Sequence, residues 1–218
     1  MATIDELRDK RAVLLDHSIR YEKARADIAE MEQAARFDQE RDRLVKPGRE
    51  RILPILDVIV PDTASDYINA LTHWERRDPG EPITVFINSP GGSVMDGFAI
   101  YDTLARMRRK GHHVTTHGSG MVASMAAVLL QAGDVRVLDK RAKLLIHEGS
   151  AHFGNERMSA GELEDYRVLN DMLTEDIISV LTERSSMSSS ELKRKWKRRD
   201  WYIGAEEALS LGFVDQVE

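Results

Sequence analysis

The stretch "HGSGMVASMAAVLLQAG", residues 117–133, places Ser124 where a strand gives way to small and apolar residues typical of a buried helix. At that helix N-terminus, free N–H groups and the helix dipole favour developing negative charge. Ser124 could therefore act as a nucleophile, with the Met125 amide binding the oxyanion that its attack on a carbonyl creates. The simpler interpretation is that Ser124 is only an N-cap. Ser119 is a rival nucleophile, but its glycine neighbours indicate a turn.

A serine at neutral pH needs a base, and a histidine ends the apolar strand "KLLIH" at His147. The base in turn needs a carboxylate to fix its tautomer, and spacing alone does not choose among several acidic residues. The adjacent glycines of "SPGG", residues 89–92, let the backbone approach a ligand closely and offer the second half of an oxyanion hole. The candidate carboxylates are Asp96, Asp102, Glu148 and Asp200.

Alternating strands and helices must position these groups. Strands are predicted over 51–60, 82–89, 112–118, 135–139 and 142–147, and helices over 63–77, 97–111, 124–133 and 160–184. Ser159 and Glu162 fit a capping box at the start of the last of these helices. The tail predicts a helix, a turn at Asp200, a short helix closed by Gly212 and a final strand. This order predicts an α/β domain with a largely parallel sheet, whose functional groups gather beyond the carboxyl ends of the strands.

Residues 1–46 differ from the rest because they contain no glycine or proline and are charged nearly throughout. Apolar residues recur every seven positions, which predicts an amphipathic helical arm that packs on its own domain or a neighbouring copy, or docks a different protein. These positions are Leu7, Leu14, Tyr21, Ile28 and Ala35. "KPGRER" at 46–51 marks the boundary, so residues 47–218 form the expected catalytic domain.

Composition excludes several function classes. The chain has 218 residues and no cysteine, which rules out disulfides, thiolate catalysis and cysteine-bound zinc, and is compatible with the cytoplasm. It carries no signal-peptide pattern and no apolar run of membrane-spanning length. A net charge of −6 argues against nucleic acid as a general partner.

Four motifs resemble, in order, those of the proteolytic subunit of the ATP-dependent Clp protease: "FINSPGGSV", "GMVASMAAVLLQAG", "LLIHEG" and "RDWYIGAEEALSLGFVDQV". The resemblance covers about residues 50–218 and implies a ClpP/crotonase-like fold of repeated ββα and βα units. It implies a serine peptidase without metal or organic cofactor. Carried over position by position, the family pattern assigns the nucleophile, base and acid to Ser124, His147 and Asp200, and the oxyanion amides to Gly92 and Met125.

The same resemblance implies an assembly. Subunits of this family stack as two rings, usually of seven, around a chamber for unfolded proteins or peptides, fed by a Clp-type ATPase. The helix near 160–184, preceded by "SAHFGNERM", resembles the handle that joins the rings. Arg199 matches a position used in contacts between the rings, whereas the basic run at 193–199 is read as a solvated or inter-subunit face rather than a nucleic-acid site.

The chain also departs from the family pattern. The long arm replaces a short segment at the axial pore, and "RILPILDVIVPDTASDYI" lacks the usual glycine-rich turn. These departures leave ATPase docking, pore geometry and ring size open, and the arm would also suit a viral capsid-maturation protease. Three further alternatives are an inactive structural ring subunit, a crotonase-type acyl-CoA enzyme, and a Ser–Lys peptidase using Lys140 or Lys143.

Overall fold

A computed structural model describes residues 51–149, 159–197 and 199–218, which belong to the compact unit Glu50–Glu218. The predicted arm, its boundary at 46 and the segment "SAHFGNERM" lie outside the described residues. The strands are β1 (Arg51–Ile55), β2 (Ile83–Ser89), β3 (Val114–Ala123), β4 (Val135–Leu138), β5 (Lys143–Ile146), β6 (Trp201–Gly204) and β7 (Gln216–Val217). The helices are α2 (Pro61–Arg77), α3 (Val94–Arg109), α4 (Met125–Leu130), α5 (Ala160–Glu183), α6 (Ser189–Trp196) and α7 (Ala205–Ser210).

The strands of the described residues form one seven-stranded sheet in the order β1-β2-β3-β4-β7, with β5 pairing with β3 and with β6. Every pairing is parallel except that of β5 with β6. Parallel neighbours need crossover connections, and the intervening helices provide them. The predicted α/β class with a largely parallel sheet is confirmed.

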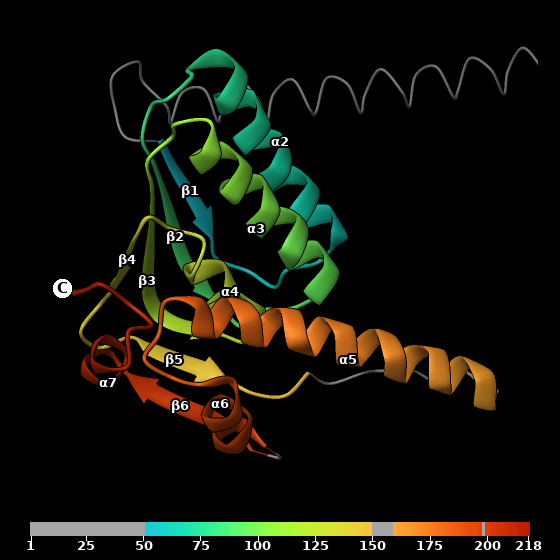
Figure 1. The fold of residues 1–218 in the computed structure, drawn as a ribbon. Helices are drawn as coiled ribbons and strands as arrows, with labels where there is room; N and C mark the ends of the chain where they lie inside the picture. Colours follow the sequence, from blue (N-terminus) through green and yellow to red (C-terminus); the bar gives the residue numbers. More distant parts are fainter. Residues whose placement is uncertain (1–50, 150–158, 198) are drawn as a thin grey trace, which may run out of the picture. The chain divides into compact units, whose positions relative to one another are not determined.

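Helices α2 and α3 lie side by side against one face of β1, β2 and β3 (Figure 1). Each helix buries one apolar stripe, and the sheet residues beneath, Val85 and Ile87, are fully buried. Burial of such side chains contributes about 1.5–3 kcal/mol each. The helical residues of this core are Ala70, Leu71, Trp74, Ile100, Leu104 and Met107.

Strand β3 changes partner along its length. Its first half pairs with β4 from Thr115↔Val135 to Gly118↔Leu138, and its second half pairs with β5 from Met121 to Ala123. Gly120 lies between the two halves with a φ of 59°, a conformation that glycine adopts without steric cost. The predicted end of this strand at residue 118 was therefore wrong, because the bend moves the strand to a new neighbour without ending it.

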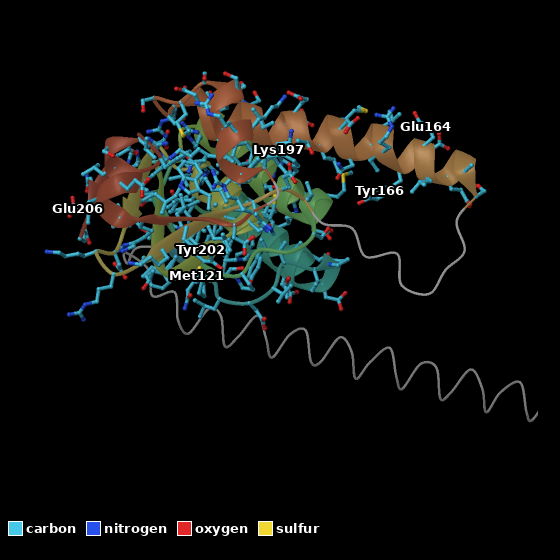
Figure 2. The ribbon with its side chains drawn as sticks, turned by 90° about the horizontal axis from the view of Figure 1, so that it is seen from below. Met121, Glu164, Tyr166, Lys197, Tyr202 and Glu206 are labelled. Atoms are coloured by element: carbon cyan, nitrogen blue, oxygen red, sulfur yellow. The ribbon has the colours of Figure 1, made fainter. Side chains whose placement is uncertain are left out.

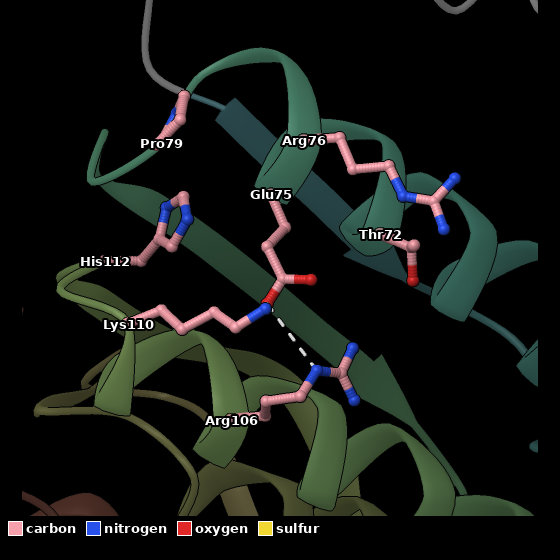
Figure 3. A pocket seen from close by; sticks show the side chains of 7 residues that line it. All are labelled: Thr72, Glu75, Arg76, Pro79, Arg106, Lys110 and His112. Atoms are coloured by element: carbon pink, nitrogen blue, oxygen red, sulfur yellow. Dashed lines mark ion pairs between the residues drawn. The ribbon is translucent and has the colours of Figure 1, made fainter.

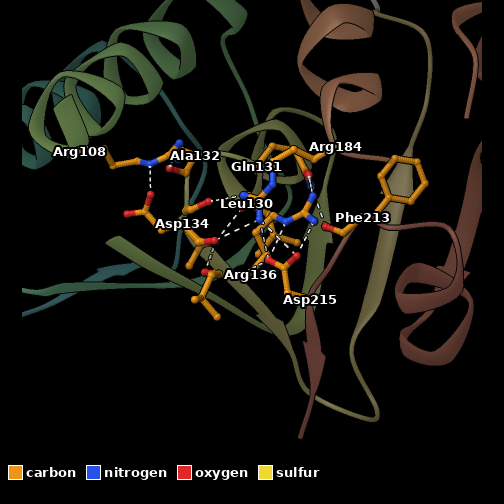
Figure 4. A network of polar contacts seen from close by, with 12 residues as sticks. Arg108, Leu130, Gln131, Ala132, Asp134, Arg136, Arg184, Phe213 and Asp215 are labelled. Carbon is orange, nitrogen blue, oxygen red and sulfur yellow. Dashed lines mark hydrogen bonds and ion pairs between the residues drawn. The ribbon is translucent and has the colours of Figure 1, made fainter. Parts of the chain in front are cut away.

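A hydrogen-bonded network fixes the C-terminal end of α4 (Figure 4). Arg136, whose side chain is 2% exposed, donates to both oxygens of Asp215 at 2.7 and 3.0 Å and to Gln131 Oε1 at 2.7 Å. Gln131 follows α4 and donates to the carbonyl of Phe213 at 3.2 Å. Arg184, just after α5, donates to Asp215 and to the Gly133 carbonyl. The network thus joins the ends of α4 and α5 to the C-terminal segment.

Helix α5 is long and mostly exposed. Its predicted capping box is confirmed: the Ser159 hydroxyl accepts from the Glu162 amide at 3.2 Å, and Glu162 Oε2 accepts from the Ser159 amide at 2.7 Å. Near its other end Ile178 and Leu181 are buried. Glu164 and Tyr166 project from this helix, as Figure 2 shows. None of the described helices is both long and apolar enough to cross a membrane.

Candidate active site

The strand register brings the three predicted catalytic residues to one edge of the sheet. Ala123 of β3 pairs with Leu145 of β5, so Ser124 follows directly at the end of β3. Ile146 of β5 pairs with Trp201 of β6, so His147 and Asp200 are the next residues on either side of that pair. Three strands that are neighbours in space, although distant in sequence, therefore present a serine, a histidine and an aspartate together.

Ser124 has a backbone conformation that side-chain-bearing residues rarely adopt. Its φ of 55° and ψ of −124° make it the one non-glycine residue of the described ranges with a positive φ. Such a conformation costs on the order of 1–3 kcal/mol and persists only where its surroundings enforce it. Here the Ser124 amide donates to the Leu145 carbonyl at 2.8 Å, and the Ser124 carbonyl accepts from Ala127 at 2.9 Å.

The interpretation of Ser124 as a plain N-cap is wrong. Ser124 occupies the N-cap position of α4, but its side chain accepts no capping hydrogen bond. By contrast, the hydroxyls of Ser159 and Ser188 both cap their helices in this way. The sharp turn leaves the Ser124 hydroxyl free of the helix that it precedes, as a nucleophile requires.

Ser119, the rival nucleophile, belongs to a different cluster of polar side chains. Ser119 lies inside β3 and not in a turn, and it hydrogen-bonds the carboxylate of Asp139. His117 Nε2 contacts the same carboxylate at 2.8 Å. The hydrogen bond from Ser119, together with the contact to His117, holds the pKa of Asp139 below its ordinary value. Ser119 and His117 thus both interact with the carboxylate of Asp139.

Of the candidate carboxylates, Asp200 is the one whose ion pair with His147 the structure records. His147 Nδ1 lies 3.8 Å from Asp200 Oδ1, with side-chain exposures of 29% and 52%. That separation exceeds a hydrogen bond, but catalytic hydrogen bonds are often long before substrate binds. Asp200 also accepts from the Tyr202 hydroxyl at 3.5 Å. Asp96 and Asp102 belong to α3, and Glu148 follows His147.

The glycine pair of "SPGG" approaches Ser124 closely. A Cβ added at Gly91 would lie 2.5 Å from the Ala123 carbonyl and 2.8 Å from both Met125 N and Ser124 Cβ. The Gly91 carbonyl accepts from Ile59 N at 2.8 Å. Because that carbonyl and the Gly92 N–H belong to one trans peptide, the N–H points away from Ile59. The predicted oxyanion donors are the Gly92 amide and the Met125 amide, and the latter lies at the start of α4, where a helix leaves its amides unpaired.

Sequence reasoning missed two residues that shape this turn. Ser89 is 1% exposed; its hydroxyl donates to the Asp57 carbonyl at 2.6 Å and accepts from the Gly91 amide at 3.1 Å. Ile59 forms a single parallel bridge with Gly92, and a Cβ on Gly92 would clash with its backbone. The serine that opens "SPGG" was a signal for the first contact, whereas no local pattern indicates the second.

Next to His147, the predicted base, a cavity of about 470 Å³ opens at Glu148 and Gly149, between the end of β5 and helices α5 and α6.

Arg199, the predicted oligomer contact, is exposed; its Nε donates to the Lys195 carbonyl at 3.1 Å. Among the residues that the structure describes, no cluster of three or more His, Cys, Asp or Glu is arranged to hold a metal ion.

Comparison with known proteins identifies the family of this chain. The family model "Clp protease" matches residues 32–218. A Deinococcus radiodurans protein, "ATP-dependent Clp protease proteolytic subunit", is 30% identical over 189 residues, covering 86% of this chain and 89% of its own length. A Prochlorococcus marinus protein, "ATP-dependent Clp protease proteolytic subunit 1", is 34% identical over 174 residues, covering 78% and 84%. The chain belongs to the Clp protease family of serine peptidases.

Proposed function

We propose that this serine peptidase cleaves peptide bonds of unfolded polypeptides with Ser124 as nucleophile, His147 as general base and Asp200 as the orienting acid. The observation that carries the proposal is the register of β3, β5 and β6, which supports these roles for three residues at one sheet edge. The strained, uncapped Ser124 adds independent support.

The chemistry is acyl transfer. His147 takes the proton of the Ser124 hydroxyl as Oγ attacks the peptide carbonyl, and the Gly92 and Met125 amides donate to the resulting oxyanion. The C–N bond breaks as His147 returns the proton to the leaving amine. Water then enters and loses a proton to His147 as it attacks the ester carbonyl. The bond from the carbonyl carbon to Ser124 Oγ breaks as His147 returns the proton to Oγ, which frees the acid product and regenerates Ser124. Asp200 orients His147 and stabilises its charged form, for which the 3.8 Å separation must shorten.

We further propose that the active form is a ring assembly of copies of this chain, supplied with substrate by a Clp-type ATPase. The relatives' names describe ATP-dependent proteolytic subunits, which supports such a partner. Arg199 remains the candidate contact between rings, because it is exposed and next to Asp200 in the chain. Native mass determination of Arg199→Ala tests this role, and an unchanged assembly with unchanged turnover would reject it.

The main test is intact-protein mass spectrometry after incubation with a fluorophosphonate. We expect one adduct per chain on the wild type and on Ser119→Ala, and none on Ser124→Ala. Ser119→Ala is the matched control, since it removes the other serine of the same strand region. An adduct that persists in Ser124→Ala would reject Ser124 as the nucleophile, whereas no adduct on the wild type would reopen the acyl-CoA and structural alternatives.

A further inference from the structure

A second cavity lies on different elements from the peptidase residues. It has a volume of about 640 Å³ and opens between the C-terminal halves of α2 and α3 (Figure 3). This volume is within the range of about 300–1,000 Å³ found for small-molecule sites. The lining residues are Thr72, Glu75, Arg76, Pro79, Arg106, Lys110 and His112.

Three cations and one carboxylate line this cavity. Glu75, whose side chain is 10% exposed, uses a single oxygen for two of them: Lys110 Nζ at 3.1 Å and Arg106 Nε at 3.5 Å. Figure 3 shows both cations directed at this carboxylate. Arg76 has no carboxylate partner among the described residues. One carboxylate cannot neutralise three cations, so the lining keeps a net positive charge in a chain whose overall charge is −6.

His112 closes the cavity without adding charge. Its ring is 97% buried, since the residue is 3% exposed. The Gly80 amide donates to Nε2 at 3.4 Å, and Nδ1 lies 2.8 Å from the Glu81 carbonyl. These contacts assign the neutral tautomer with its proton on Nδ1. The positive charge of the cavity therefore comes from Arg76, Arg106 and Lys110.

The helix dipoles do not account for this arrangement. Arg76 and Arg106 lie in the last turns of α2 and α3, where cations complement the dipole. Any face of the last turn would meet that need, as Arg108 demonstrates by pairing with Asp134 at 2.6 Å outside the cavity. Arg106 is held at the cavity by its ion pair with Glu75, whereas Arg76 lines the same cavity from the other helix without a carboxylate partner among the described residues.

The rest of the lining indicates the ligand. Pro79 is its one apolar residue, whereas pockets for drug-like molecules are mostly apolar and aromatic. Two guanidinium groups and an ammonium group hold more N–H donors than the two oxygens of Glu75 can accept, and guanidinium groups match phosphate in geometry. We propose that this cavity binds the adjacent phosphate groups of a small oligophosphate ligand. The lining has no aromatic residue to stack on a base, so the phosphates carry the recognition.

Calorimetric titration of the full chain with inorganic triphosphate, at physiological ionic strength, tests the proposal. We expect saturable binding of one ligand per chain, weakened about tenfold or more by Arg106→Gln and by Arg76→Gln, as loss of a charge-assisted contact implies. Arg109→Gln is the matched control, because Arg109 is an exposed cation of the same helix outside the cavity, and it should bind like the wild type. Arg76→Gln removes an exposed side chain, so its thermal unfolding should match that of the wild type.

Three outcomes would overturn the proposal: no saturable binding to the wild type, equal weakening in Arg109→Gln, or equal binding of citrate, which would indicate any polyanion. Adenosine triphosphate serves as a further arm. Equal affinity for the nucleotide and inorganic triphosphate supports recognition of the phosphates alone, whereas binding of the nucleotide only contradicts it. Fluorophosphonate labelling is not a readout here, so the result is independent of the proposed peptidase mechanism.

Discussion

The two ends of α4 differ in how tightly their polar groups are held. At the N-terminal end, Ser124 has a strained backbone, its hydroxyl caps no amide, and the His147–Asp200 pair is 3.8 Å apart. At the C-terminal end, Gln131 and the partly exposed Asp215 make hydrogen bonds of 2.7–3.0 Å with the buried Arg136. A helix of six residues has little stability of its own, so the packing of its buried side chains and its hydrogen-bonded C-terminal end together hold the reactive end in place.

The largest expected effect tests the reactive end. Ser124→Ala should lower peptidase activity by roughly 10⁴-fold or more, because the proposed nucleophile is lost, while leaving the melting temperature within error. Ser124→Gly should lose the same activity but be more stable than Ser124→Ala by about 1 kcal/mol, since glycine relieves the positive φ. Peptide hydrolysis and thermal unfolding of both variants measure this. Equal melting temperatures would mean that the backbone of Ser124 is not strained.

The next effect tests the fixed end. Asp215→Ala should destabilise the fold by roughly 3–5 kcal/mol, because it leaves the buried Arg136 guanidinium unpaired. Asp171→Ala is the control: its ion pair with Arg167 on the surface of α5 should contribute at most about 1 kcal/mol. Urea unfolding of the three proteins measures the difference. Similar losses for both variants would contradict the contrast between buried and exposed pairs.

A smaller effect at the reactive end distinguishes a steric clash near Ser124 from backbone strain alone. Gly91→Ala should lower activity by about 10²–10³-fold, because its Cβ meets the backbone of Ala123 and Met125 and displaces an oxyanion donor. Gly111→Ala has a similar φ, 93° against 88°, but nothing within 4 Å of the added Cβ. It should lose stability only, with full activity per folded chain. Hydrolysis rates normalised to folded protein distinguish the two, and equal activities would contradict the close approach at Gly91.

The smallest effect concerns pH at the fixed end. Burial raises the pKa of Asp215, but the hydrogen bonds and charge of Arg136 outweigh it, so this pKa lies below its ordinary value of 3.8. A lowered folded-state pKa gives stability that is complete above 3.8 and is lost as the pH falls through the folded value. The difference in unfolding free energy between wild type and Asp215→Asn should therefore be constant from pH 7 to about 5 and shrink below pH 4. A constant difference down to pH 3 would contradict this linkage.

Much of this architecture follows from sequence pattern. Alternating apolar runs predicted the strands, and the spacing of Ser159 and Glu162 predicted a cap that the structure contains. The first strand was predicted too long: it ends at Ile55, because its ladder with β2 ends there. Helix α2 begins at Pro61 rather than at Thr63 or Ser65, since the fixed φ of proline suits the first helical position.

Other parts of the candidate site could not be predicted from the sequence, because they depend on contacts between segments that are distant in the chain. The residues alone left four carboxylates open for His147, and only the antiparallel pairing of β5 with β6 brings Asp200 opposite. The bulky neighbours of Gly91 come from β3 and α4, which no local pattern connects to "SPGG". The burial of Arg136 could not be predicted either, because the local pattern "VRVLD" does not indicate that Asp215 neutralises this arginine.

The change of partner along β3 has a consequence for how this chain tolerates insertions and deletions. The pairings with β4 and β5 fix both halves of one continuous strand, so the eight residues from His117 to Ser124 span a fixed distance between them. Removing one residue there would turn each later side chain of the strand to the opposite face. Length changes should be accepted at exposed turns such as 140–141 but not within this strand, where the distance between the two halves of the sheet sets the direction of the proposed nucleophile.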